Sequence, residues 1–308
     1  MIMERIVIDG TIPCSEMVMI TGVWVPLVTP FKDGAVDFVS HRRLIEHYIG
    51  KGVSGLFPLG TTGEAPTIDD DEEDAIVAET VDAAAGRVPV FVGIGGNATG
   101  KVIKTIRRLD RHAFSGIVSV CPYYNRPTQA GMYEHFAAIA AATGRQVLIY
   151  NIPYRTSVNL TNETLLRLAE VPNIVGVKDS AGSMTQSLDL LASRPAGFSV
   201  LTGEDMLFFP QLCSGADGGI LASAHIATDR FVDIARRVAA NDHLGARAIW
   251  EPLQRFIPRL FEEANPTPIK YCLWRQGLIV SPECRLPLTS VSVELGRILD
   301  RLLADLAR

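Results

Sequence analysis

The chain has 308 residues, a mass of 33.5 kDa and a formal net charge of -5 at pH 7. Its 47% hydrophobic and 20% charged residues are ordinary globular values and exclude a disordered polymer. The acidic balance argues against a nucleic-acid partner, and five scattered cysteines without a C-x-x-C motif argue against a disulfide framework or a zinc site. With no signal-peptide pattern and no apolar run of ~18 residues, we expect a cytoplasmic protein without a membrane span.

Eight short apolar segments recur along the chain, with starts 20 to 33 residues apart. Most are continuous rather than alternating, which is typical of strands buried on both faces of a parallel sheet. The predicted strands are Val23–Val28, Gly55–Leu59, Val88–Gly93, Gly116–Val120, Gln146–Asn151, Ile174–Asp179, Phe198–Gly203 and Gly218–Ala222.

Segments with helical periodicity fill the gaps between these strands. Eight strands that alternate with helices predict an α/β fold, a (β/α)8 TIM barrel, with a doubly wound open sheet as the alternative because spacing alone does not show closure. The predicted helices are Phe38–Ile49, Asp70–Ala85, Ala98–Leu109, Gly131–Ala142, Thr161–Leu168, Ser183–Leu191 and Met206–Cys213.

After Ala222 the strand pattern stops and only helical patterns follow. We therefore divide the chain into an N-terminal extension (1–22), a barrel (23–239) and a C-terminal helical region (240–308) that packs on the barrel or on another subunit. The helices expected there, together with the last one of the barrel, are Phe231–Ala240, Leu244–Glu263, Ile269–Gln276 and Val291–Leu306.

Barrel active sites lie at the carboxyl ends of the strands, and Lys178 is the one lysine that follows an apolar strand segment. Burial disfavours an ammonium ion, and a neutral amine can attack a ketone to form a Schiff base. The alternative is a structural ion pair between Lys178 and an acid such as Asp179 or Glu64.

Schiff-base formation also requires proton transfers and a place for a substrate carboxylate. Tyr150 ends the neighbouring strand, and Thr62 follows the second strand, so the two hydroxyl groups can serve as a proton relay beside Lys178. Thr61, Thr62 and nearby backbone N–H groups can hold a carboxylate, and Arg155 offers a bidentate clamp for a second one. The alternatives are a core aromatic for Tyr150, a helix cap for the threonines and a surface cation for Arg155.

Other mechanisms lack a signal in this sequence. The six histidines are dispersed without an H-E-x-x-H pair, so we expect no metal site and no metal-dependent aldolase. There is also no G-x-S-x-G nucleophile elbow of the hydrolase type. An imine on Lys178 needs no cofactor.

Taken together, these segments resemble the dihydrodipicolinate synthase / N-acetylneuraminate lyase superfamily, from about Gly22 to Ser292. The motifs that carry the resemblance are Gly60-Thr61-Thr62-Gly63-Glu64, Tyr150-Asn151-Ile152-Pro153-x-Arg155-Thr156, Gly176-Val177-Lys178-Asp179-Ser180 and Gly203-Glu204-Asp205. Two further motifs look most like the dihydrodipicolinate synthase branch, namely Cys121-Pro122-Tyr123-Tyr124-Asn125-Arg126-Pro127 and Asn265-Pro266-Thr267-Pro268-Ile269-Lys270.

The resemblance implies a role for each matching residue. Lys178 would form the imine with pyruvate, and Tyr150 would be the acid/base residue. Thr62 would relay protons between Tyr150 and Tyr124, the latter supplied by a neighbouring subunit of a dimer or a dimer of dimers. Thr61 and Thr62 would hold the pyruvate carboxylate, Arg155 would bind the aldehyde substrate, and Gly203 and Ile220 would line the pyruvate pocket.

The sequence also departs from the family pattern. Ser157 stands where the synthase branch usually has glycine, and Tyr154 is bulkier than the usual residue, so both could alter the second-substrate pocket. In lysine-inhibited members, a dimer-interface site uses two histidines and a glutamate, which Asp70, Glu73 and Lys101 replace here. The resemblance therefore predicts weak or absent feedback inhibition by L-lysine.

Three functional hypotheses follow. The first is a class I lyase that condenses pyruvate with L-aspartate 4-semialdehyde to 4-hydroxy-tetrahydrodipicolinate, in lysine and diaminopimelate biosynthesis. The second is a pyruvate-dependent aldolase or dehydratase that acts on a 2-keto-3-deoxy sugar acid. The third is a non-catalytic keto-acid-binding regulator, against which the presence of Lys178, Tyr150, Thr62 and Tyr124 argues.

Overall fold

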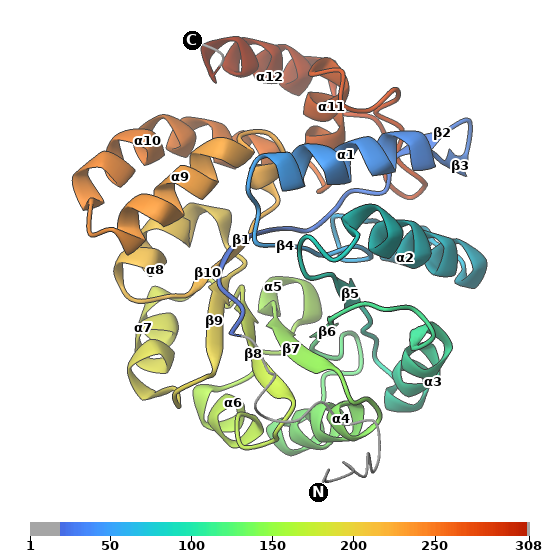
Figure 1. The fold of residues 1–308 in the computed structure, drawn as a ribbon, viewed down its shortest axis with the longest axis vertical. Coiled ribbons are helices and arrows are strands. Elements are labelled where there is room, and N and C mark those ends of the chain that lie inside the picture. Colours follow the sequence, from blue (N-terminus) through green and yellow to red (C-terminus); the bar gives the residue numbers. More distant parts are fainter. Residues whose placement is uncertain (1–18, 307–308) are drawn as a thin grey trace, which may run out of the picture.

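The computed structural model describes residues 19–306 and shows a ring of eight parallel strands surrounded by helices (Figure 1). The hydrogen-bonded order is β4-β1-β10-β9-β8-β7-β6-β5. A parallel bridge between Leu56 and Val90 joins the two ends of this order, so the sheet closes into a barrel. The strands are β1 (Gly22–Val25), β4 (Gly55–Leu56), β5 (Phe91–Gly93), β6 (Gly116–Val120), β7 (Gln146–Asn151), β8 (Ile174–Asp179), β9 (Ser199–Thr202) and β10 (Gly218–Ile220).

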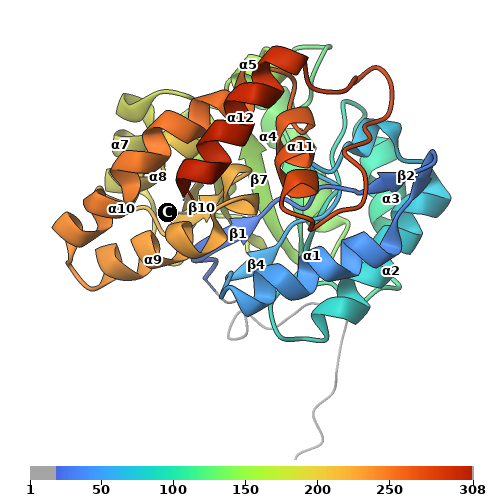
Figure 2. The ribbon, with the colours of Figure 1, turned by 90° about the horizontal axis from the view of Figure 1, so that it is seen from above.

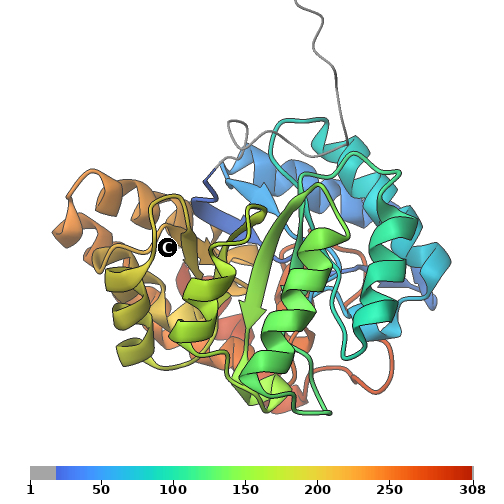
Figure 3. The same cartoon turned by 90° about the horizontal axis from the view of Figure 1, so that it is seen from below.

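The (β/α)8 prediction is confirmed, and the open-sheet alternative is wrong. β6, β7 and β8 begin and end at the predicted residues, whereas the other strands are shorter than predicted at one or both ends. The helices around the barrel, which flank the strands also in Figure 3, are α1 (Phe38–Gly50), α2 (Asp70–Ala84), α3 (Thr99–Leu109), α4 (Gln129–Ala141), α6 (Asn162–Leu168), α7 (Met184–Ser193), α8 (Phe208–Cys213) and α9 (Thr228–Ala239).

The apolar side chains form two clusters, one between strands and helices and one inside the barrel. Inside the barrel, Trp24 and Phe91 pack edge to face with ring centroids 5.1 Å apart. Gly55 makes room for this packing, because a Cβ at that position would lie 2.4 Å from the Trp24 ring. Aromatic side chains therefore fill the barrel interior beneath the strand ends that carry the site.

The C-terminal region is helical, as predicted, but the long helix expected at Leu244–Glu263 is wrong. α10 (His243–Phe256) passes into a separate 3-10 helix, η5 (Ile257–Phe261), with Pro258 in its first turn. A proline has no N–H for the helical ladder and clashes with the preceding turn, which explains the break. α11 (Thr267–Arg275) and α12 (Val293–Leu306) pack against each other on the outside of the barrel (Figure 2).

Two small elements were not predicted. β2 (Phe31–Lys32) and β3 (Ala35–Val36) form an antiparallel hairpin, and the helical turn α5 (Pro153–Thr156) follows β7. Of the predicted N-terminal extension, residues 1–18 lie outside the described residues. Among residues 19–306, no helix combines the length and the apolar character that crossing a membrane requires.

Candidate active site

Lys178 and Tyr150 lie side by side on neighbouring strands. They are register partners in the parallel pairing of β8 with β7, so both side chains point to the same face, into the barrel mouth. The Lys178 ammonium nitrogen lies 4.1 Å from the centre of the Tyr150 ring and 5.4 Å from that of Phe57. Only 5% of Lys178 is exposed.

The structural ion pairs considered for Lys178 are not formed. Glu64 pairs with Lys270, and the Asp179 carboxylate accepts hydrogen bonds from the Ser187 hydroxyl and the Ala181 N–H. Within residues 19–306, Lys178 thus lacks a close carboxylate partner. The amine is consequently available for chemistry.

Burial sets the protonation of the two central groups. Desolvation lowers the pKa of Lys178 from 10.5 to about 8, although Asp205 and Glu204 oppose the shift. About a tenth of the amine is then neutral at pH 7, several hundred times more than for an ordinary lysine. Desolvation raises the pKa of Tyr150, so its hydroxyl stays protonated and can donate.

A cavity in front of the amine collects most of the predicted residues. Gly203 leaves room for these side chains, because a Cβ at this position would lie 2.7 Å from Cε of Lys178 and 2.2 Å from Oγ of Ser180. The cavity is lined by Pro26, Thr61, Thr62, Tyr150, Tyr154, Arg155, Lys178, Gly203, Asp205, Ile220, Ala222, Phe261 and Asn265.

Thr61 and Thr62 sit on the loop that follows β4. Thr62 is buried, with 3% exposed, and its Oγ1 accepts a hydrogen bond of 3.0 Å from Nδ2 of Asn265. The cap interpretation of these threonines is wrong, since the residue that caps α2 is Asp69, through a reciprocal bond with Glu72. Both threonines line the cavity that contains Lys178.

Arg155 reaches the same cavity from α5. Its guanidinium lies 5.4 Å from the centre of the Tyr154 ring, and both side chains are largely exposed toward the opening. Ser157, which follows this turn, has a φ of +61°. A left-handed backbone favours glycine at this position, and the serine adopts it without displacing Arg155 from the cavity.

Tyr124 is the one predicted site residue that the chain does not bring to the cavity. It is 90% exposed, and its φ of +74° lies in the left-handed region, in the loop after β6. Tyr123 lines a second, larger hollow that extends from Tyr150 and Thr61 to Pro287 and Leu288. An exposed side chain is what a contribution of Tyr124 to the site of another subunit requires.

Sequence reasoning missed three polar residues of the site. Glu204 and Asp205 follow Gly203 after the end of β9, and Asn265 precedes α11. Asp205 accepts a backbone bond from Ser223, and burial raises its pKa. Burial, then the charge of Asp205, raises the pKa of Glu204 to about 7, and Glu204 Oε1 has no hydrogen-bond partner among the described residues. For Glu204 and Asp205, the position at a strand end was the available signal. In the Gly203-Glu204-Asp205 motif, however, the sequence analysis assigned a role only to Gly203.

The fold and this geometry define a class of protein: a (β/α)8 enzyme with a buried, partly neutral lysine at the end of its sixth barrel strand. In residues 19–306 there is no group of three or more His, Cys, Asp or Glu that could hold a metal ion. The sequence model of the dihydrodipicolinate synthetase family matches residues 19–305, and the chain belongs to this family.

Individual relatives agree with this assignment. The chain is 50% identical over 284 residues to 4-hydroxy-tetrahydrodipicolinate synthase 2 of Clostridium acetobutylicum, which covers 92% of this chain and 99% of that protein. It is 42% identical to 4-hydroxy-tetrahydrodipicolinate synthase of Laribacter hongkongensis, over 89% of this chain and 94% of that protein.

Solved structures show the same fold. A dihydrodipicolinate synthase described as the first monomeric variant superposes with a TM-score of 0.93 at 34% identity, covering 97% of this chain and 99% of that one. The chloride-inhibited dihydrodipicolinate synthase of Acinetobacter baumannii, complexed with pyruvate, has a TM-score of 0.91 at 36% identity and covers 94% and 99% of the two chains.

Proposed function

We propose that this enzyme condenses pyruvate with L-aspartate 4-semialdehyde to 4-hydroxy-tetrahydrodipicolinate through an imine on Lys178. The observation that carries the proposal is the placement of a buried, partly neutral Lys178 beside Tyr150 in a cavity that also contains Thr61, Thr62 and Arg155. The family, and relatives that bear this activity in their names, supply the substrates.

The chemistry follows from the side chains. The neutral amine of Lys178 attacks the keto carbon of pyruvate, and the carbinolamine loses water to give the imine. Loss of a proton from the pyruvate methyl group gives an enamine, whose carbon attacks the aldehyde. Tyr150 donates and accepts the protons of these steps, with Thr62 as relay. The amino group that came from the semialdehyde then attacks the imine carbon and displaces the amine of Lys178, which closes the ring of 4-hydroxy-tetrahydrodipicolinate and frees the lysine. No cofactor enters the cycle.

The carboxylates of the two substrates find separate partners in this proposal. Thr61 and Thr62 hold the pyruvate carboxylate, Gly203 and Ile220 line the pyruvate side of the cavity, and Arg155 binds the aldehyde substrate. Tyr124 completes the relay from a second copy of the chain, so we propose a homo-oligomer of at least two subunits.

Reductive trapping tests the first half of the proposal. Pyruvate with borohydride is expected to add a stable mass to Lys178, as read by peptide mass spectrometry, and Lys178→Ala should abolish the adduct. The absence of any adduct on the wild-type protein would refute Schiff-base chemistry altogether.

A substrate panel tests the second half. Aspartate semialdehyde and a set of 2-keto-3-deoxy sugar acids are compared in coupled assays, and turnover of the semialdehyde is expected to dominate. Faster turnover of a sugar acid would instead support the alternative aldolase or dehydratase. Ser157 and Tyr154 favour that alternative, because both depart from the synthase pattern near the second-substrate pocket. Adduct formation without turnover of any partner would support a keto-acid-binding regulator.

A further inference from the structure

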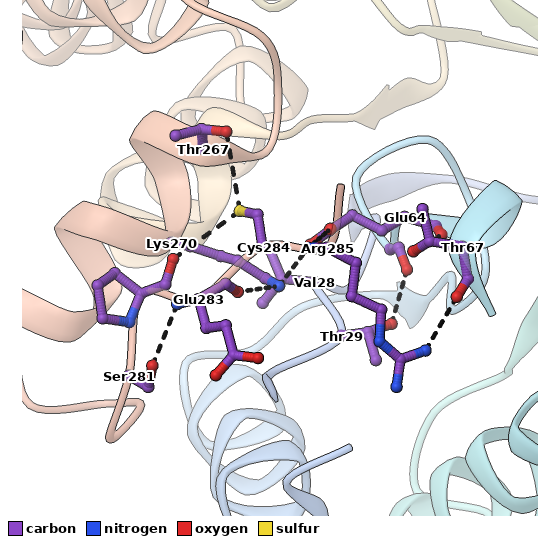
Figure 4. Close-up of polar contacts among 12 residues, drawn as sticks. Val28, Thr29, Glu64, Thr67, Thr267, Lys270, Ser281, Glu283, Cys284 and Arg285 are labelled. Atoms are coloured by element: carbon purple, nitrogen blue, oxygen red, sulfur yellow. Dashed lines mark hydrogen bonds and ion pairs between the residues drawn. The ribbon is translucent and has the colours of Figure 1, made fainter. Parts of the chain in front are cut away.

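A buried ion pair lies behind the site and takes no part in the proposed chemistry. Lys270 of α11 and Glu64 of the loop after β4 form it, and both side chains are completely buried. The Lys270 ammonium also donates a 2.8 Å bond to the Glu283 carbonyl (Figure 4). It lies 4.1 Å from the centre of the Phe31 ring. Two fully buried charges are expensive unless they are well paired, so the chain sustains this pair at a cost.

Glu64 closes the loop that carries the two threonines. The loop begins at Leu59 with a φ of +59° and ends at Glu64 with a φ of +56°. Residues other than glycine stay in this left-handed region only where their surroundings hold them. The Glu64 carboxylate provides such a hold, because it pairs with Lys270 and accepts a 3.0 Å bond from the Arg285 N–H (Figure 4).

The partners of Glu64 belong to the C-terminal region and are fixed themselves. Arg285 makes a two-point contact of 2.6 Å to each oxygen of Glu72, and it stacks over Phe31 with a distance of 4.3 Å to the ring centre. Its guanidinium also donates to the Thr67 carbonyl. The 281–285 segment is thereby tied to the start of α2, on the far side of the loop.

The same region contacts the reactive end of the loop through Asn265. Since Thr62 Oγ1 accepts a bond from Asn265, its own hydrogen is left to be donated elsewhere. On the barrel side, the Thr29 hydroxyl donates a 2.7 Å bond to the Gly63 carbonyl. Contacts from the C-terminal region thus meet the loop at Thr62 and at Glu64.

We propose that Glu64 and Lys270 are positioning residues for pyruvate: their ion pair locks the loop so that Thr61 and Thr62 face the imine-forming amine. The C-terminal helical region then completes the pyruvate subsite and is more than an assembly surface. This inference rests on the proposed function, in which the two threonines bind pyruvate. The ion pair is not expected to affect Arg155 or the binding of the aldehyde.

Three variants separate positioning from stability. Lys270→Met leaves the Glu64 charge buried alone, whereas the double variant Glu64→Gln/Lys270→Met removes both charges at nearly constant volume, a change that proteins often tolerate. The matched control is Asp217→Asn, which weakens the partly buried pair of Asp217 with Arg194 at the opposite end of the barrel. Each variant is assayed for thermal stability, for the pyruvate concentration that half-saturates borohydride trapping, and for the KM of aspartate semialdehyde.

For Lys270→Met and for the double variant, we expect the half-saturating pyruvate concentration to rise about tenfold or more, as small misplacements of a binding group do. The KM of the semialdehyde should stay within about twofold, and Asp217→Asn should lower the melting temperature without changing the pyruvate dependence. If neither methionine variant folds, Glu64→Gln, which keeps one acceptor oxygen and replaces the other by an amide donor, is expected to show a rise of about threefold.

The inference would be overturned if the double variant showed the same pyruvate dependence as the wild type. Where only Glu64→Gln folds, the same result in that variant would overturn it. The ion pair would then be a stabilising contact only. An equal effect of Asp217→Asn would overturn it as well. The absence of an adduct on the wild-type protein would instead refute the proposed function, so the two failures are distinguishable.

Discussion

Lys178 combines its reactivity with a cost in folding free energy. One pKa unit corresponds to about 1.4 kcal/mol. Lowering the pKa from 10.5 to about 8 therefore reduces the free energy of unfolding by on the order of 3 kcal/mol at neutral pH, because most of the folded protein then contains a buried ammonium. The desolvation that makes the amine nucleophilic is the same interaction that destabilises the protein.

Replacement of this lysine should therefore stabilise the fold while it abolishes activity. We expect Lys178→Met to unfold at a higher temperature than the wild type at pH 7. The unfolded lysine titrates near 10.5 and the folded one near 8, so the cost is fully present below pH 8 and fades as pH rises toward 10.5. Thermal melts between pH 7 and pH 10 measure this, and a difference that did not shrink with pH would contradict the desolvation argument.

Glu204 is the second residue whose burial has a functional consequence. Its pKa is raised, its Oε1 has no hydrogen-bond partner within residues 19–306, and its side chain lines a cavity that also contains Arg155. L-Aspartate 4-semialdehyde carries a carboxylate and an ammonium group, which match a guanidinium and a carboxylate. An ammonium beside Glu204 would restore its ionised form.

We expect Glu204→Gln to raise the KM of aspartate semialdehyde about tenfold or more, since charged hydrogen bonds contribute ~1.5–3 kcal/mol. Borohydride trapping of pyruvate should persist. Glu251→Gln on α10, which removes a surface pair with Arg247, is the control and should leave both readouts unchanged. An unchanged KM in Glu204→Gln would remove Glu204 from the aldehyde subsite.

At the residue scale, the strand ends in the sequence predict residues that the structure brings to one cavity, whereas residues that meet only through tertiary contacts were not predicted. Lys178 and Tyr150 could be predicted because each ends a long apolar segment. The sequence did not predict that Glu64 pairs with Lys270 instead of Lys178, since Glu64 and Lys270 are more than 200 positions apart. The same holds for Asn265, which meets Thr62 from the far end of the chain.

Elements were predictable where local pattern and tertiary demand agree. β6, β7 and β8 are five- or six-residue strands buried on both faces, so their continuous apolar segments mark both ends. β4 has only two residues, although the apolar segment that predicted it continues to Leu59. The chain leaves the sheet after Leu56, ahead of the Gly60–Glu64 loop. The hairpin of β2 and β3 was missed, as two-residue strands have no periodicity to detect.

The packing of α2 against α3 is relevant to feedback inhibition. Arg108 of α3 pairs with Asp70 and Glu73 of α2, two residues that replace the histidines of the lysine-binding site in the family resemblance. Lys101, at the position of the glutamate in that site, is exposed on α3. The two carboxylates that could attract a lysine ammonium therefore already share the guanidinium of Arg108, which weakens that attraction.

We expect sub-millimolar L-lysine to leave the initial rate of condensation unchanged. The dihydrodipicolinate synthase of Cyanidioschyzon merolae that was solved with lysine bound, 32% identical to this chain, provides a positive comparison for the assay. Inhibition of this enzyme in the same concentration range would show that Asp70, Glu73 and Lys101 form a lysine site after all.

At the scale of the whole molecule, Tyr124 decides how subunits would share an active site. Tyr124 is 90% exposed and lies outside the cavity that holds Lys178. If it serves the site of a neighbouring subunit, each active site combines Lys178 of one chain with Tyr124 of another. Two chains with different defects could then restore one complete site between them.

Mixing Lys178→Ala with Tyr124→Phe tests this arrangement. Each variant alone should be inactive or nearly so, whereas subunit exchange should restore activity. In a dimer, the Tyr124→Phe chain keeps its own Lys178 and receives Tyr124 from its partner. The opposite site stays dead, so random mixing restores roughly a quarter of wild-type activity. Co-purification through two different affinity tags verifies that hybrids form. Hybrids without activity would show that Tyr124 acts within its own chain or not at all.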